Sequence, residues 1–261
     1  MKIAVCLKAV PDTDTRIKIA ADGRSIDRSE IKYIMSPYDE YALEEAIRTK
    51  EAKGGDVVVV GLGGDEVPAV LRDGLARGGD SAIHVSSNGV ATEDPLAVGK
   101  ALAAALKSVN ADIIFFGKHG VGGDNQQVHT IVAELLGLPQ ATMVVKLQIN
   151  DRNVRCEREI EGGLEVIETT LPVVIGANKG MNEPRYPKLP AIMQAKKKPF
   201  ATKTIADLGL SAADVSEAAS ATYITGMYLP PARQAGRKLE GDVNEQVTGL
   251  IQALQGEAKV L

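Results

Sequence analysis

Residues 56–85 read DVVVVGLGGDEVPAVLRDGLARGGDSAIHV, and this stretch decides the fold. The valines at 57–60 form a β-branched apolar run, which is typical of a strand buried on both faces. Apolar side chains then recur at helical spacing until Gly78 and Gly79 end the helix, and residues 82–85 predict the next strand. Strand, helix and strand in this order predict parallel strands joined by a right-handed crossover.

The same alternation continues on both sides of this stretch. Ser36 is expected to cap a helix, with Pro37 in its first turn and Asp39 at the capping-box position. Residues 11–34 lack a helical period and predict a long loop with short strand pieces. The further predicted elements are a strand at residues 3–7, helices at about 37–53, 95–108 and 128–136, and a strand at 113–116.

The pattern changes after residue 140. Residues 143–149, 154–160 and 164–171 are short, strand-like and separated by turn signals, which predicts an antiparallel meander added to the sheet. Residues 178–200 contain four prolines and no amphipathic period, so we expect them to be extended and exposed.

The predicted fold class is α/β: a Rossmann-like parallel sheet with helices on both faces, an added antiparallel meander and an extended C-terminal arm. Residues 1–200 are assigned to the α/β domain and residues 201–261 to the arm. The arm carries little apolar content before a helical stripe of Val243, Val247, Leu250, Ile251 and Leu254. Such a helix needs a surface to cover it, and another chain is one candidate.

Composition excludes several classes of protein. The chain has 261 residues, with Lys+Arg 30 against Asp+Glu 34, and its basic residues are scattered, so a nucleic-acid footprint is not expected. Cys6 and Cys156 lie far apart without a CxxC pair, which argues against a disulfide framework or a cysteine-based metal site. The apolar run at residues 3–7 is too short for a signal peptide, and no stretch approaches a membrane span. A cytoplasmic protein is expected.

The strongest candidate for chemistry is the glycine-rich loop at residues 117–127, which should follow a strand and enter a helix. Its four glycines let the backbone approach a ligand, and N–H groups at a helix N-terminus favour anions. The loop lacks the GxxxxGK[ST] order, so phosphate binding is plausible and ATP hydrolysis is not. A plainer alternative is that Asp124 merely caps the helix. The glycines at residues 61–64 either make a turn or approach a ligand.

No catalytic constellation stands out. His84 is expected in a strand, His119 in the glycine loop and His129 on a helix, and no pair has HExxH spacing, so no metal site is predicted. No nucleophile and base can be paired by spacing. Catalytic residues are therefore assigned to none.

Three longer motifs carry a family resemblance. Residues 158–167 read REIEGGLEVI and are followed by LPVVI at 171–175, while NEPRY occupies 182–186 and LPAIMQAKKK occupies 189–198. Over essentially its whole length the sequence resembles the β subunit of electron transfer flavoprotein.

The resemblance implies an electron carrier that works as a heterodimer. In that family an α subunit carries the redox FAD, and the β subunit helps enclose it while its C-terminal arm wraps the partner. Electrons come from acyl-CoA or other flavoprotein dehydrogenases and pass towards the respiratory chain, commonly through a membrane quinone oxidoreductase. The recognition loop, residues 182–198, would dock the dehydrogenase through Leu189, with Pro190, Ile192 and Met193 beside it.

The resemblance also implies an adenine nucleotide in this subunit, either AMP or, in electron-bifurcating relatives, a second FAD. AMP is favoured because Gln126 is longer than the small residue of the bifurcating type, although residues 10–13 resemble that type. Two classes of protein outside the family are also compatible with the sequence: a universal-stress-type nucleotide-binding protein and an interaction scaffold with a relict nucleotide loop. The contacts carried over by position are Cys6, Ser36, Pro37, Tyr38, Asp39, Leu62, Gly117, Lys118, His119, Gly120, Val121, Gly122, Gly123, Asp124, Asn125, Gln126, Gln127 and Val128.

Overall fold

The computed structural model describes residues 1–232 and 235–261, and these fall into two compact units, Met1–Gly226 and Met227–Leu261. The strands are β1 (Lys2–Cys6), β2 (Ala9–Pro11), β3 (Tyr33–Met35), β4 (Asp56–Gly63), β5 (Ser81–Ser86), β6 (Ile113–Gly117), β7 (Gln140–Asn150), β8 (Asn153–Ile160), β9 (Gly163–Thr170), β10 (Val173–Ala177) and β11 (Phe200–Lys203). The helices are α1 (Pro37–Lys53), α2 (Val67–Arg77), α3 (Pro95–Val109), α4 (Val128–Leu136), α5 (Leu189–Ala195), α6 (Ala212–Val215) and α7 (Val243–Gln252). Short turns of 3-10 helix, η1 (Ala206–Leu208) and η2 (Glu217–Ala219), and a π-helical turn, η3 (Ala253–Ala258), complete the described elements.

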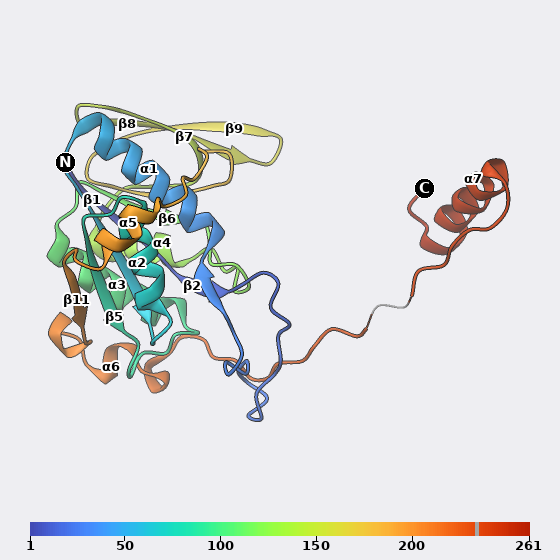
Figure 1. The fold of residues 1–261 in the computed structure, drawn as a ribbon, viewed down its shortest axis with the longest axis horizontal. Coiled ribbons are helices and arrows are strands. Elements are labelled where there is room, and N and C mark those ends of the chain that lie inside the picture. The colour runs from blue at the N-terminus through green and yellow to red at the C-terminus, as the bar shows by residue number, and fades with distance from the viewer. Residues whose placement is uncertain (233–234) are drawn as a thin grey trace. The chain divides into compact units, whose positions relative to one another are not determined.

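One sheet organises the first unit, in the strand order β11-β5-β4-β1-β6-β10-β7-β8-β9 (Figure 1). Its strands pair in parallel from β11 to β7, and β7, β8 and β9 then pair antiparallel. The predicted α/β fold class and meander are confirmed. From β1 the chain moves outward to β4 and β5, then returns to β6 on the other side of β1, which makes a topological switch point between β1 and β6.

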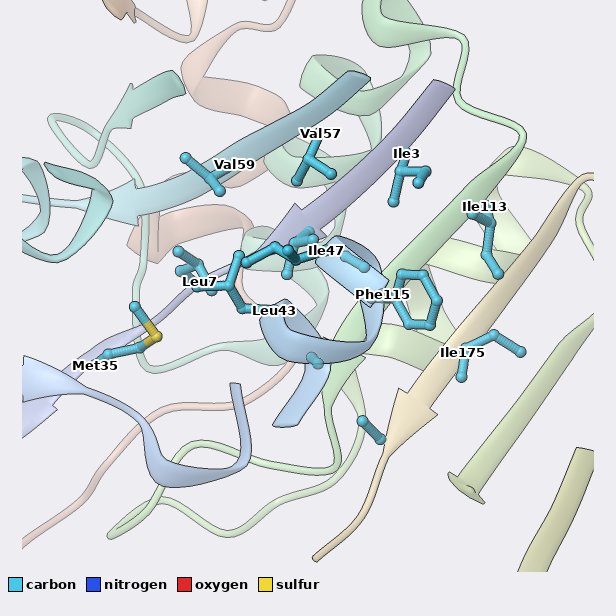
Figure 2. Packing of buried hydrophobic residues seen from close by; sticks show 14 of the residues in the cluster. Ile3, Leu7, Met35, Leu43, Ile47, Val57, Val59, Ile113, Phe115 and Ile175 are labelled. Carbon is cyan, nitrogen blue, oxygen red and sulfur yellow. The ribbon is translucent and has the colours of Figure 1, made fainter. Parts of the chain in front are cut away.

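Helices cover both faces of the sheet. On one face, side chains of β1, β4, β6 and β10 such as Ile3, Val57 and Phe115 pack against Leu43 and Ile47 of α1 (Figure 2). The alternate residues of the same strands point to the other face, where they meet α3 and α4. Burial on both faces is the physical reason why these strands are continuous apolar runs.

The segment 178–200 is not extended throughout, contrary to the expectation from its prolines. It contains α5, which packs against α2, and it leads into β11, which pairs with β5 at the edge of the sheet. Pro190 lies in the first turn of α5, where a proline costs no hydrogen bond, and the helix is too short to show a period.

The start of the expected arm also belongs to the first unit. Residues 201–226 include β11 and α6, and Val215 of α6 is completely buried. The compact unit therefore extends to Gly226, beyond the boundary placed at residue 200 from the sequence. Within the second unit, α7 carries the predicted apolar stripe, and its Val243, Val247, Leu250 and Ile251 are all exposed.

Strand β10 was not assigned from the sequence, although it lies inside the sheet between β6 and β7. All its residues are buried, and Gly176 is so close to α4 that an added Cβ would lie 2.7 Å from Cδ2 of His129.

Among the residues that the structure describes, no helix is long and apolar enough to cross a membrane.

His129 predicts a pH dependence of stability. Burial lowers the pKa of His129 to about 4, whereas a histidine in an unfolded chain has a pKa of about 6.5. Between these values the unfolded state binds more protons, so the stabilisation is present above pH 6.5 and is lost as the pH falls through 4. The free energy of unfolding of the wild type, relative to that of His129→Gln, should fall by about 2 to 3 kcal/mol from pH 7 to pH 4. Urea unfolding of both proteins at several pH values measures this difference in free energy. The effects of the other titrating groups are the same in both proteins and cancel. A difference that does not change with pH would contradict the prediction.

Candidate functional site

The candidate site lies at the carboxyl ends of β1 and β6, at the switch point of the sheet. Asp39 of α1 joins the segments that meet there. One of its carboxylate oxygens accepts a hydrogen bond from the backbone N–H of Lys8 at 2.7 Å, and the other accepts one from that of Gly117 at 3.0 Å. The structure thus brings the start of α1 and the loop at residues 117–127 together.

The N-terminus of α1 differs from its predicted capping box. Ser36 occupies the N-cap position, but its side chain makes no capping hydrogen bond, and its hydroxyl donates to the carbonyl of His119 at 3.3 Å. Asp39 cannot complete the box because both of its oxygens bind Lys8 and Gly117. Burial raises the pKa of Asp39 to about 7, so the group titrates near neutrality.

Position 117 requires a glycine because the first turn of α1 approaches it closely. A Cβ there would lie 2.4 Å from Oδ1 of Asp39 and 2.6 Å from the backbone carbon of Tyr38. The end of β6 therefore rests directly on the first turn of α1, with no room for a side chain between them.

The loop itself has an unusual backbone. Gly122, Asp124 and Gln126 have φ angles of 94°, 47° and 54°, and Gln127 then returns to the right-handed region. A left-handed residue followed by a right-handed one, as at Gln126 and Gln127, is the backbone pattern of anion-binding nests. The N-cap of α4 is Gln127, and the carboxylate of Asp124 instead accepts from the N–H of Gly122 at 3.2 Å. The alternative that Asp124 merely caps this helix is therefore wrong.

Aromatic and cationic groups line the entry to the loop. The rings of Tyr38 and His119 meet edge to face, with centroids 4.5 Å apart, and Nζ of Lys118 lies 5.2 Å from the centroid of the Tyr38 ring. Nδ1 of His119 is buried without a hydrogen-bond partner in the described part of the chain. Burial lowers the pKa of His119, which favours the neutral ring and leaves a polar atom ready to bind a ligand group.

Lys8 belongs to this site but was missed by sequence reasoning. Its carbonyl accepts from the N–H of Ser36 at 2.9 Å, and its side chain runs along Gly120. In the sequence, a single lysine after an apolar run indicates only the end of a strand. The role of Lys8 in the site was therefore not predicted. Its position directly after the first strand, at a switch point, is the signal that could have found it.

Cys6 and Leu62 lie beneath the site rather than in the loop. Both belong to the side of the core that α3 and α4 cover, and Cys6 is buried. Burial, helped by the charge of Asp39, raises the pKa of the Cys6 thiol well above its usual value, so the thiol stays protonated.

Residues 61–63 are part of β4 itself, whereas the sequence suggested a loop after the strand.

The recognition loop presents apolar side chains to the outside. Leu189 is 80% exposed and Met193 is 67% exposed, and Pro190 and Ile192 of α5 are exposed as well. The structure thus shows these four residues together on one short helix.

Ion pairs and hydrogen bonds fix this loop to α1 and α2. The Arg185 guanidinium binds the buried Glu44 carboxylate through Nε at 2.8 Å and the Glu51 carboxylate through Nη1 at 2.6 Å. At the other end, Nη1 of Arg72 donates to the carbonyl of Ala195 at 2.8 Å. The apolar side chains are therefore held on a fixed backbone.

Gly117→Ala is predicted to destabilise the chain by about 2 to 3 kcal/mol or more, because the new methyl group would collide with backbone atoms of α1. Gly163→Ala is the matched control, since its Cβ would meet no atom within 4 Å, and its effect should stay within about 0.5 kcal/mol. Equal unfolding midpoints and slopes in urea for the two variants would show that β6 and α1 are not in this close contact.

Comparison with known proteins gives one consistent family. The model of the electron transfer flavoprotein domain matches residues 24–208. The chain is 39% identical over 262 residues to the electron transfer flavoprotein subunit beta of Bacillus subtilis, with both chains fully covered. It is 37% identical to that of Bradyrhizobium diazoefficiens and 38% identical to the mitochondrial subunit beta of Arabidopsis thaliana, again with full coverage of both chains. The chain therefore belongs to the electron transfer flavoprotein family, as a β subunit.

Proposed function

We propose that this chain forms a heterodimer with an electron transfer flavoprotein α subunit and helps to enclose the FAD that the α subunit carries. The FAD supplies the electron-carrying chemistry, and the β chain supplies enclosure and docking. The heterodimer accepts electrons from acyl-CoA or other flavoprotein dehydrogenases in the cytoplasm. It then passes them towards the respiratory chain through a quinone oxidoreductase. The full-length similarity to β subunits carries this proposal.

We further propose that AMP binds at the loop of residues 117–127 and has a structural role. The residues present fit such a group. Gln126 and Gln127 have the left-handed and right-handed conformations of an anion-binding nest, and the buried Nδ1 of His119 lacks a partner in the described part of the chain. Tyr38 and Lys118 add an aromatic ring and a positive charge beside it. Ser36, Asp39 and Gly117 would fix the shape of the site rather than touch the ligand.

A second FAD in place of AMP is the alternative within the family. The side chain of Gln126 favours AMP, because it is longer than the small residue of the bifurcating type at this place. In the structure Gln126 borders an open hollow of about 710 Å³ along β8 and the turn after it.

The two exposed apolar surfaces support partner binding. The recognition loop offers Leu189, Ile192 and Met193 on a fixed backbone, which suits a transient anchor for a dehydrogenase. The stripe on α7 suits a lasting contact with the α subunit, since an amphipathic helix needs an apolar surface to lie on. A universal-stress-type protein would have no use for residues 227–261.

The nucleotide proposal predicts the cofactor content of the heterodimer. Denaturing the purified complex should release FAD and AMP in equal amounts, as measured by chromatography of the supernatant. Release of FAD without AMP would contradict the assignment of AMP and favour the bifurcating alternative.

Leu189→Ala is predicted to raise the KM for the partner dehydrogenase about tenfold and leave the FAD content unchanged. The reason is that burial of a leucine side chain contributes about 1.5 to 3 kcal/mol, most of which the truncation removes. Steady-state reduction by the dehydrogenase measures it.

Leu135→Ala is the matched control, because Leu135 is an exposed leucine on α4, outside the recognition loop, and should leave the KM unchanged. Loss of FAD from Leu189→Ala would mean that the loop is structural, and an unchanged KM would place docking elsewhere.

A further inference from the structure

Lys8 holds a fixed place at the switch point. Its N–H donates to Asp39 at 2.7 Å, its carbonyl accepts from Ser36 at 2.9 Å, and both partners are buried. The backbone from which the side chain departs is therefore set by two hydrogen bonds. The side chain of Lys8 is exposed, and it leads from the end of β1 to Gly120 and Gly123 of the loop at residues 117–127.

The glycines of the loop make room for this side chain. A Cβ on Gly120 would lie 2.5 Å from Cδ of Lys8 and 3.0 Å from its Nζ. Gly120 does not have a positive φ, so no turn geometry requires a glycine there. A side chain at this position would displace that of Lys8 from its present place. A Cβ on Gly123 would lie 3.7 Å from the same Nζ, which is ordinary contact.

Lys8 forms no ion pair among the described residues, although its charge acts on Asp39 and opposes the rise that burial causes in the pKa of that carboxyl. Within the described residues no carboxylate oxygen lies within 4 Å of its Nζ, whereas Lys50 pairs with Asp80 at 2.6 Å. Asp39, the nearby acid, directs both oxygens to backbone N–H groups. Asp124 lies on the loop with its carboxylate against Gly122 and His119. The ammonium group thus lies beside Gly120 and Gly123 of the loop, without an ion-pair partner in the described part of the chain.

We propose that Lys8 is the side chain that binds the phosphate of the nucleotide in this loop. The inference rests on the proposed function and adds to it the group that is recognised. A lysine acts on phosphate as a point charge, so a monoester and a pyrophosphate are both suitable ligands. The N–H groups of the loop give the phosphate its place, and Lys8 makes binding depend on its charge.

The test uses the heterodimer, stripped of its nucleotide and titrated by calorimetry with AMP and with adenosine. Lys8→Met keeps the length of the side chain and removes its charge. It should weaken AMP binding about tenfold or more, the scale of one charge-assisted hydrogen bond, and leave adenosine binding unchanged. Lys8→Arg should stay within a few-fold of the wild type.

Two glycine variants test the placement without removing the charge. Gly120→Ala should displace Lys8 and weaken AMP binding several-fold, while Gly123→Ala, its matched control, should resemble the wild type. Raising the salt concentration should weaken AMP binding to the wild type more than to Lys8→Met.

The outcomes separate this inference from the proposed function. Unchanged AMP binding by Lys8→Met would show that the ammonium is merely solvated, and an equal loss of AMP and adenosine would show a structural role. Either result overturns the inference and leaves the AMP site standing. If the wild type binds FAD here instead, FAD and riboflavin replace AMP and adenosine in the same comparison. If the wild type binds none of these phosphates, the nucleotide site and the role of Lys8 both fail.

Discussion

The buried carboxyl group of Asp39 is the interaction on which the site depends. Strands β1 and β6 stay paired as far as Val5 and Phe115, and beyond this point their connections diverge. The N–H groups of Lys8 and Gly117 lie past the end of that ladder, and Asp39 accepts from both. A buried donor without a partner costs about 1 to 3 kcal/mol, so one side chain satisfies two groups that the switch point would otherwise leave open. The start of α1 and the start of the loop are thereby fixed to the same strand ends.

The burial of the Asp39 carboxyl group costs solvation free energy. A carboxylate is taken out of water without a hydrogen-bonded cation, and burial raises its pKa to about 7. The proximity of Gly117 to α1 leaves no space for a solvating water between them. Asp39 therefore lies beneath the loop as a group that titrates near neutrality, and the positive groups Lys8 and Lys118 lie close to Gly120 of the loop and Tyr38 of α1 respectively.

Most of the fold follows from the sequence because it depends on local periodicity. The valine run at 57–60, the helix α2 and the glycines after it give their positions directly. The short elements α5 and β11 were missed because a seven-residue helix with a proline in its first turn has no period to detect. Strand β10 was missed because its buried residues follow the meander without a helix between.

The glycine-rich loop of the candidate site could be predicted from the sequence. The contacts between residues that are far apart in the chain could not. The loop at 117–127 was found from residue type and position, whereas Ser36 was assigned to the site only through the family resemblance. The roles of Asp39 and Lys8 arise from contacts between residues far apart in the chain, which no spacing rule contains. The clamp of Arg185 on Glu44 and Glu51 is of the same kind.

In the described part of the chain, β9 is the last strand of the sheet. Open strand edges can recruit other chains, and charged side chains on an edge oppose such pairing. Glu165 and Glu168 lie along β9 and pair with Arg158 and Arg155 of β8 at 3.3 and 3.9 Å. Leu164 and Val166 of the same strand are exposed. A strand added to this edge would therefore have to fit ion pairs and apolar side chains in one stretch.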